Sequence, residues 1–261
     1  MDLQLSGKTA IVTGASKGIG LAVVGGLILE GVHVIAGARS MSAELEELVA
    51  GGAAEFVAVD LATPGGPEEL VRHATAANGI DILVNNVGAV APRPEGVTSV
   101  TDGEWERTVN LTLMAAVRTI RAAVPAMSAR GGGSVVTIAS VNAWLPDPLV
   151  VDYSAAKAAL LNFSKSLSKE LGRSGIRVNT ISPGPVATSL WLGEHGVAQA
   201  VSNASGGTPE EVAAAAASAS VTGRFTRPEE VADLVLVLAS DRFSNITGAD
   251  FRIDGGLIDT I

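Results

Sequence analysis

The sequence predicts an α/β fold in which a doubly wound, seven-stranded parallel sheet carries helices on both faces. Short apolar runs, each the length of a buried strand, alternate along the chain with longer segments of helical periodicity. This alternation is typical of βαβ units, and buried parallel strands read as continuous apolar runs. The strand-like runs are Thr9–Thr13, Val32–Ala36, Glu55–Val59, Ile80–Val84, Ser134–Ala139, Arg177–Ile181 and Ala249–Ile253. The helix-like segments are Gly18–Glu30, Ala43–Ala50, Pro67–Ala77, Thr101–Ser128, Asp152–Arg173 and Pro228–Ser240.

Residues 1–261 form a single domain in this interpretation, because no polar linker or shift in composition divides the chain. The alternation is interrupted only by segment 186–223, which lies between a Pro-Gly turn and the last helix. Insertions of this length are usually functional lids or disordered loops, and we expect a substrate lid. Within it, Pro209–Ser220 is expected to be a helix with Thr208 as its cap and two acidic residues in its first turn.

Charge and missing residue types exclude several classes of function. The formal net charge of −9 repels phosphate backbones, so no nucleic-acid partner is expected. The chain has no cysteine, which excludes disulfides, zinc–thiolate sites and thiol nucleophiles. Its three histidines, His33, His73 and His195, are too scattered to indicate a metal site. No secretion signal or membrane-length apolar run is seen, so we expect a cytoplasmic protein without a membrane partner.

A glycine-rich segment, Thr13–Gly20, follows the first strand directly and leads into a helix. Glycines let the backbone turn tightly and approach a pyrophosphate, and the helix beginning there offers free N–H groups. The spacing G-x-x-x-G-x-G differs from the G-x-G-x-x-G dinucleotide fingerprint, and the alternative is a plain strand-to-helix turn. Its place after the first strand favours a dinucleotide site.

The end of the second strand indicates which dinucleotide is bound. An NAD site usually has an acidic residue there to bond the ribose 2′-hydroxyl, and this segment has no Asp or Glu. Arg39 stands where a guanidinium can grip a 2′-phosphate, and Lys17 can reach the same group. We therefore expect NADP(H) rather than NAD, the alternative being that Arg39 is an ordinary surface residue.

The only tyrosine, Tyr153, lies four residues before Lys157 in an expected helix. Positions i and i+4 share a helix face, and a nearby ammonium favours the phenolate and lowers the pKa of the phenol. Such a tyrosine can donate a proton to a carbonyl oxygen or accept one from an alcohol. Ser140 ends the preceding apolar strand, where its hydroxyl can bond the substrate oxygen. A surface Tyr–Lys pair and a turn serine are the alternatives.

Taken together, these motifs resemble the short-chain dehydrogenase/reductase family in its single-domain, Rossmann-type form, and in particular ketoreductases that act on 3-oxoacyl groups carried by acyl carrier protein. The resemblance covers Lys8 to Gly256. It rests on Thr13–Gly20, Asp60-Leu61, Asn85–Gly88, Asn110, Ser140, Tyr153 with Lys157, and Pro183–Thr188. It implies hydride transfer between nicotinamide and a ketone or secondary alcohol, without a metal.

Roles for four catalytic residues follow from the resemblance. Tyr153 would be the general acid/base, and Lys157 would bond the nicotinamide ribose while lowering the pKa of the tyrosine. Ser140 would orient the carbonyl, and Asn110 would anchor a water that links Lys157 to solvent. The implied cofactor contacts are Gly14, Ser16, Lys17, Gly18, Ile19, Gly20, Arg39, Ser40, Asp60, Leu61, Asn86, Gly88, Tyr153, Lys157, Pro183, Gly184, Val186 and Thr188.

The substrate stays open at this stage. Trp144, Trp191, Leu192 and Val90 are expected near the mouth of the site, which suggests an apolar or ring-bearing carbonyl compound or alcohol. The resemblance allows ketoacyl, steroid, sugar and small cyclic ketones. It also implies a homodimer built on Thr101–Ser128 and Asp152–Arg173, or a homotetramer completed by Asp254–Ile261.

Two alternatives remain. A non-catalytic dinucleotide sensor would usually lack the Tyr–Lys pair, and an NAD-dependent alcohol dehydrogenase of the same family differs in cofactor only. A P-loop phosphotransferase is excluded, because it needs Gly-Lys-Ser/Thr after its glycines, whereas here Lys17 precedes Gly18.

Two features depart from the expected pattern. Val87 replaces the usual alanine of the Asn-Asn-Ala-Gly turn, and Gly25-Gly26 lies inside the first helix, where glycine is unfavourable.

Overall fold

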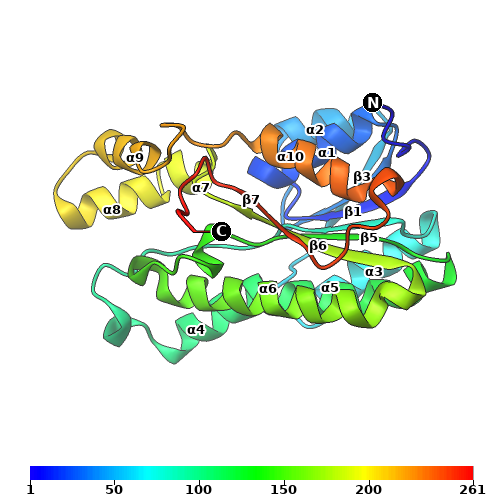
Figure 1. Ribbon diagram of the computed structural model, residues 1–261, viewed down its shortest axis with the longest axis horizontal. Coiled ribbons are helices and arrows are strands. Elements are labelled where there is room, and N and C mark those ends of the chain that lie inside the picture. Colours follow the sequence, from blue (N-terminus) through cyan, green and yellow to red (C-terminus); the bar gives the residue numbers. More distant parts are fainter. Residues whose placement is uncertain (261) are drawn as a thin grey trace.

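The computed structural model describes residues 1–260 and consists of one seven-stranded sheet with helices packed on both faces (Figure 1). All strands are parallel, and their order is β3-β2-β1-β4-β5-β6-β7. The strands are β1 (Thr9–Thr13), β2 (His33–Ala38), β3 (Ala54–Ala58), β4 (Ile82–Asn85), β5 (Gly133–Ile138), β6 (Ile176–Pro183) and β7 (Asp250–Ile253). The predicted doubly wound sheet is thereby confirmed.

Two helical layers enclose the sheet, as Figure 1 shows. One face is covered by α1 (Gly18–Leu29), α2 (Ala43–Ala50) and α10 (Pro228–Ala239). The other face is covered by α3 (Gly66–Ala77), α5 (Ala115–Ala129) and α6 (Val151–Leu171). Successive side chains of a strand point to opposite faces, so each strand feeds both cores: Val84 packs under the first layer and Leu83 under the second.

The predicted helix Thr101–Ser128 is divided in the structure. It consists of α4 (Asp102–Val109), a π-helical turn at Asn110–Met114, and α5. A π-helical turn inserts one extra residue into a helix and often lies at a functional site. Here it begins at Asn110, one of the expected catalytic residues.

Segment 186–223 contains three helices, α7 (Ser189–Leu192), α8 (Val197–Ser205) and α9 (Pro209–Ser218), which extend past one end of the sheet (Figure 1). The expected α9 is confirmed together with its cap, since Thr208 Oγ1 accepts a hydrogen bond from the N–H of Glu211. The Glu211 carboxylate in turn accepts from the N–H of Thr208, which completes a capping box.

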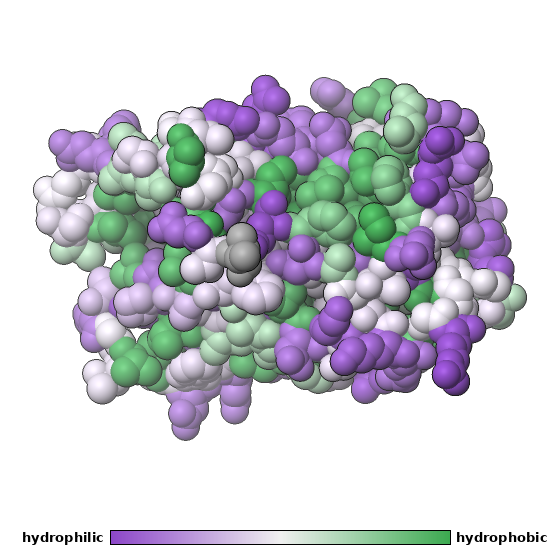
Figure 2. Space-filling model, in the orientation of Figure 1, coloured by the Kyte–Doolittle hydropathy of each residue, from purple (hydrophilic) through white to green (hydrophobic). Residues whose placement is uncertain are grey.

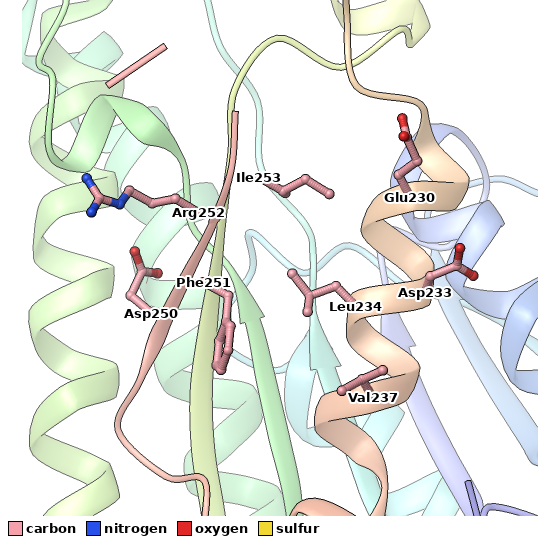
Figure 3. Close-up of a pocket in the computed structure, with 8 residues that line it drawn as sticks. All are labelled: Glu230, Asp233, Leu234, Val237, Asp250, Phe251, Arg252 and Ile253. Atoms are coloured by element: carbon pink, nitrogen blue, oxygen red, sulfur yellow. The ribbon is translucent and has the colours of Figure 1, made fainter. Parts of the chain in front are cut away.

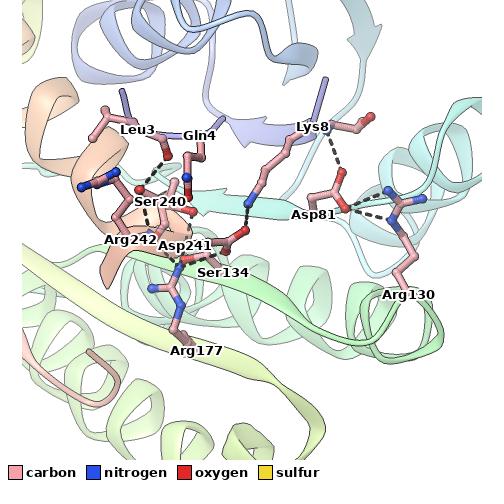
Figure 4. A network of polar contacts seen from close by, with 12 residues as sticks. Leu3, Gln4, Lys8, Asp81, Arg130, Ser134, Arg177, Ser240, Asp241 and Arg242 are labelled. Atoms are coloured by element: carbon pink, nitrogen blue, oxygen red, sulfur yellow. Dashed lines mark hydrogen bonds and ion pairs between the residues drawn. The ribbon is translucent and has the colours of Figure 1, made fainter. Parts of the chain in front are cut away.

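A polar network ties the amino-terminal edge of the sheet together (Figure 4). Arg177 of β6 is buried, and its guanidinium donates to the carbonyl oxygens of Leu238 (2.8 Å) and Ser240 (3.0 Å) at the end of α10. The hydroxyl of Ser134 in β5 donates to the same Leu238 oxygen. These donors satisfy carbonyls that a helix end leaves without partners. The opposite, carboxyl-terminal edge is the one to which the glycine-rich segment and the Tyr–Lys pair belong.

Candidate active site

The glycine-rich loop between β1 and α1 is shaped so that only glycine fits at its centre. A Cβ at Gly20 would overlap the carbonyl oxygen of Gly14, and Gly14 itself has a φ of +65°. No side chain caps the first turn of α1, and no acidic residue lies there. The loop therefore presents free N–H groups and a backbone surface that an anion can approach closely. It fits a pyrophosphate.

The turn after β4 is fastened to this loop. Asn86 Nδ2 donates to the carbonyl oxygens of Thr13 (3.0 Å) and Gly14 (3.1 Å). In return, Thr13 Oγ1 accepts from the N–H groups of Asn86 (2.9 Å) and Val87 (3.1 Å). Asn86 thus acts as a structural link between two loops of the same sheet edge. Val87 provides a backbone donor in this link.

The other expected cofactor residues lie along the same edge. Arg39 and Ser40 are exposed directly after β2, and Asp60 is exposed after β3, where Leu61 turns into the core. Lys17 is exposed next to α1, Ser16 and Ile19 are half-buried, and Gly18 comes close to Thr188, whose methyl group would lie 3.1 Å from a Cβ at that position. The segment Pro183–Thr188, which includes Gly184 and Val186, therefore crosses from β6 to the glycine-rich loop.

Tyr153 and Lys157 lie one turn apart near the start of α6, as predicted. The side chain of Lys157 is 3% exposed; its Nζ donates to the carbonyl oxygen of Ile138 (2.6 Å) and lies 5.6 Å from the centre of the Tyr153 ring. Gly88 adjoins the same amine, because a Cβ there would lie 3.7 Å from Nζ. Three separate segments thus meet at the ammonium group.

The pKa of the tyrosine shifts in the direction opposite to the one expected from its spacing to Lys157. Burial raises the pKa of Tyr153 to about 12, while hydrogen bonding with Ser140 acts to lower it. Burial also lowers the pKa of Lys157 to about 7. A low-dielectric environment disfavours both charged forms, so burial favours the neutral phenol of Tyr153 and the neutral amine of Lys157 alike.

Ser140 follows β5 and is buried beside its neighbour Asn142. Its Oγ accepts from the N–H of Asn142 (3.2 Å) and donates to Asn142 Oδ1 (3.3 Å). The Asn142 amide in turn donates to Ser154 Oγ on α6 (3.4 Å). Asn142, which the sequence reasoning missed, therefore connects the serine loop to the helix that carries Tyr153.

Asn110, at the start of the π-helical turn, is held by an arginine. Its Oδ1 accepts from Arg118 Nη2 (3.0 Å), and its carbonyl oxygen accepts from the N–H of Ala115. Arg118 Nη1 also donates to the carbonyl oxygen of Ala62, just after the expected adenine contacts (3.2 Å). Both oxygens of Asn110 thus have protein donors. Arg118, eight residues away along the helix, was not identified from the sequence.

A buried ion pair lies immediately before Tyr153. The carboxylate of Asp152 accepts from Arg93 Nη2 (2.7 Å) and from Thr108 Oγ1 (2.8 Å). Arg93 also pairs with Glu104 of α4 (2.6 Å). Burial acts to raise the pKa of Asp152, but the hydrogen bonds from Arg93 and Thr108 outweigh it, so this pKa lies below its ordinary value. The pair fixes the start of α6.

Four buried side-chain atoms find no hydrogen-bond partner within residues 1–260. They are Asn85 Nδ2, Asn85 Oδ1, Thr112 Oγ1 and Thr137 Oγ1. An unsatisfied buried polar group costs about 1–3 kcal/mol, which is a large share of the roughly 5–15 kcal/mol that stabilises a domain. Buried polar groups without a partner are rare in folded proteins, and they usually have a specific cause such as a bound water, a ligand or a functional role.

Of the four residues expected at the mouth of the substrate site, the two tryptophans make contacts that tie loops to the rest of the protein. Trp144 Nε1 donates to Asp250 Oδ2 of β7 (2.9 Å), which ties the loop after Ser140 to the edge strand. Trp191 of α7 packs against Phe225, with 5.4 Å between ring centres. Leu192 is exposed and Val90 is half-buried.

Two open grooves lie away from these residues. Apolar side chains gather over α10 and β7 in Figure 2, and Figure 3 shows the groove of about 690 Å³ that Leu234, Val237, Phe251 and Ile253 line there. A second groove of about 750 Å³ lies between α3 and α5. Neither groove is lined by an expected site residue, so the candidate active site is the carboxyl-terminal edge of the sheet and not one of these grooves.

Up to residue 260, no three or more His, Cys, Asp or Glu side chains are grouped so that they could hold a metal ion. None of the helices in this part is both long and apolar enough to cross a membrane.

Comparisons with known proteins agree with this arrangement. The profile of the family described as Enoyl-(Acyl carrier protein) reductase matches residues 14–258. The 3-alpha-(or 20-beta)-hydroxysteroid dehydrogenase of Mycobacterium tuberculosis is 33% identical over 99% of this chain and 92% of its own. The 3-oxoacyl-(acyl-carrier-protein) reductase FabG of Thermotoga maritima is 32% identical over 98% and 100%. Among solved structures, L-sorbose reductase from Gluconobacter frateurii, complexed with NADPH and L-sorbose, has a TM-score of 0.91 and 36% identity over the full length of both chains.

Proposed function

Because the chain belongs to the short-chain dehydrogenase/reductase family of oxidoreductases, we propose that it is an NADP(H)-dependent enzyme that interconverts a ketone and a secondary alcohol, with Tyr153 as the general acid/base. One observation carries the proposal: Tyr153, Lys157 and Ser140 meet at the sheet edge that also holds the glycine-rich loop. The nicotinamide, when bound, supplies or takes the hydride.

In the direction of reduction, Tyr153 donates its proton to the carbonyl oxygen as that oxygen gains negative charge. A pKa of about 12 keeps the phenol protonated at neutral pH, so the acid is ready before the reaction begins. Ser140 turns its hydroxyl proton from Asn142 Oδ1 to the same oxygen and orients it. Lys157 in its protonated form stabilises the phenolate that forms, because an ammonium close to a phenolate favours the charged form. In oxidation the same groups act in reverse.

The cofactor preference is proposed from Arg39. It is exposed at the end of β2, where no carboxylate competes for a ribose hydroxyl, and the L-sorbose reductase structure contains NADPH. A hydrogen bond to a charged group contributes about 1.5–3 kcal/mol, so Arg39→Ala should raise the KM for NADPH about 10- to 100-fold. The KM for NADH should not change. Arg173→Ala, an exposed arginine at the other edge of the sheet, is the matched control. Equal or better use of NADH by the unmodified protein would refute the preference.

The substrate class is tested by following NADPH oxidation with a panel of carbonyl compounds. The relatives are named for a ketose, a hydroxysteroid and an oxoacyl thioester, so the panel contains L-sorbose, a ketosteroid, a 3-oxoacyl thioester and a cyclic ketone. Turnover of at least one ketone supports the enzyme. Tight binding of NADPH without any turnover would instead support the non-catalytic sensor.

We also propose an assembly, a location and a substrate lid for the protein. The apolar faces of α5 and α6 are the expected dimer surface, with a tetramer completed by the C-terminal segment, and light scattering that shows a stable monomer would contradict this. The cytoplasm remains the expected location. Helices α7 to α9 of the single domain are proposed as the lid over the substrate.

A further inference from the structure

Asn142 lies between the two segments that carry Ser140 and Tyr153. It belongs to the short helical turn Val141–Ala143, which follows β5 and packs against α6. Its side-chain Oδ1 lies 3.3 Å from Ser140 Oγ, and its Nδ2 lies 3.4 Å from Oγ of Ser154, the residue after Tyr153. Asn142 is half-buried, whereas Ser140 and Ser154 are buried, so Asn142 is the member of this polar chain that a ligand can reach most easily.

The contacts of Ser154 fix which end of the amide faces Ser140. Ser154 Oγ accepts from the N–H of Asp147 (3.3 Å) and donates to the carbonyl oxygen of the same residue (3.4 Å). A hydroxyl has a single proton, so Ser154 can only accept from Asn142. The NH₂ group of Asn142 therefore faces Ser154, and its carbonyl oxygen faces Ser140.

That amide oxygen accepts the only proton of Ser140. Ser140 Oγ accepts from the backbone N–H of Asn142 (3.2 Å) and donates to Asn142 Oδ1, which has no other donor within residues 1–260. When Ser140 turns this proton to a substrate carbonyl, Asn142 Oδ1 becomes an acceptor without a donor. An acceptor left unpaired beside a bound ligand weakens binding, and a ligand that supplies a donor there removes this loss.

The distance between the two protein oxygens indicates where the donor lies on the substrate. Ser140 Oγ and Asn142 Oδ1 are 3.3 Å apart. A carbonyl oxygen and a hydroxyl oxygen on the neighbouring carbon are also separated by about one hydrogen-bond length. The two pairs can therefore meet side by side, with Ser140 donating to the carbonyl oxygen and the neighbouring hydroxyl donating to Asn142. A hydroxyl one carbon further along the substrate lies farther from the carbonyl oxygen.

We propose that Asn142 determines specificity by accepting a hydrogen bond from a hydroxyl on the carbon next to the reacting carbonyl, so that α-hydroxyketones and the matching vicinal diols are the preferred substrates. The inference rests on the proposed function, because it assigns Ser140 to the carbonyl oxygen. Reduction adds a hydride from NADPH to the carbonyl carbon and the proton of Tyr153, which solvent later replaces, to its oxygen. The products are the vicinal diol and NADP⁺, and the hydroxyl at Asn142 keeps its proton throughout.

Three ketones that differ by one hydroxyl test this preference. They are 2-butanone, 3-hydroxy-2-butanone, whose hydroxyl is on the neighbouring carbon, and 4-hydroxy-2-butanone, whose hydroxyl is one carbon further away. The measured quantity is kcat/KM with NADPH, as a ratio to 2-butanone. Asn142→Ala should lower this ratio for 3-hydroxy-2-butanone about 2- to 10-fold, the effect of one hydrogen bond between neutral groups. The ratio for 4-hydroxy-2-butanone should not change. Comparison of the variant with wild type cancels the different intrinsic reactivities of the ketones.

Two further variants separate recognition of the hydroxyl from damage to the fold. Asn142→Asp keeps an oxygen toward Ser140, and Ser154 can turn its proton to the second oxygen, so the ratio should return toward that of wild type. Asn78→Ala is the matched control, since Asn78 is exposed between α3 and β4 at the amino-terminal edge of the sheet. A distorted serine loop would lower kcat/KM for all three ketones alike. An unchanged ratio in Asn142→Ala would overturn the proposal.

Binding provides a readout that does not need turnover. In an NMR titration of the protein with bound NADP⁺, Asn142→Ala should raise the Kd for 3-hydroxy-2-butanone about 2- to 10-fold and should not raise the Kd for 2-butanone. If no ketone is reduced even by the unmodified protein, the proposed function fails, while this titration still judges the contact with the hydroxyl. Equal Kd values for 3-hydroxy-2-butanone in wild type and variant would overturn that contact.

Discussion

Asp152→Asn is expected to destabilise the protein strongly. The Asp152 carboxylate is 1% exposed and accepts from Arg93 (2.7 Å) and Thr108 (2.8 Å), so neutralising it leaves the Arg93 charge half-buried with Glu104 as its remaining partner. Removing one partner of a buried pair costs about 3–5 kcal/mol. For a chain of this size that corresponds to a fall in Tm of roughly 10 °C.

Urea unfolding measures this loss, and Asp241→Asn is the matched control. Asp241 also forms an ion pair, with Lys8, but its side chain is 63% exposed, and an exposed pair contributes only about 0–1 kcal/mol. Because the folded-state pKa of Asp152 is lowered, its contribution is fully present above the unfolded pKa of about 4 and is lost as pH falls through the folded pKa. The difference between wild type and Asp152→Asn should therefore stay constant from pH 7 to 5 and shrink below pH 4. Equal losses for the two variants at pH 7 would refute the reasoning.

Three further outcomes are expected. Gly25→Ala should raise the free energy of unfolding by about 0.5–1 kcal/mol, because a Cβ at this position inside the helix meets open space. Gly26→Ala should raise that free energy by less, because its Cβ would lie 3.3 Å from Leu236. Urea unfolding of both variants checks this. Lys157→Met should stabilise the cofactor-free protein at pH 7 by up to about 4 kcal/mol, because the folded-state pKa of Lys157 lies below the unfolded one. This stabilisation should shrink as pH rises toward 10. An unchanged or lower stability at pH 7 would contradict the burial of the amine. Gly20→Ala should abolish NADPH binding in a fluorescence titration, because its Cβ would overlap the loop backbone; wild-type affinity would contradict the cradle.

The strands and the glycine-rich loop could be predicted because each leaves a local pattern. A buried parallel strand is apolar on both faces, so β1 was identified with its exact ends, and the others within two residues. The cap of α9 could be predicted for the same reason, because Thr208 and the acidic residues of the first helical turn are neighbours in sequence. The position of Tyr153 one helical turn from Lys157 follows from the same short-range geometry.

Features that depend on distant contacts could not be predicted. Nothing in the residues near Asn110 marks a π-helical turn, and the contact of Arg118 with Asn110 spans that turn. Arg93 and Asp152 are 59 residues apart in sequence and meet only in the folded chain. Spacing alone also gave the wrong direction for the pKa of Tyr153, because burial has no signature in the sequence.

The most direct test of the proposed chemistry is Tyr153→Phe, which removes one oxygen and leaves the ring in place. We expect kcat for ketone reduction with NADPH to fall by about 10²- to 10⁴-fold, while the Kd for NADPH stays within about twofold of wild type. The variant keeps Lys157 and Ser140, so any remaining turnover measures what they contribute without the acid. Near-normal reduction by Tyr153→Phe would contradict the role assigned to the phenol.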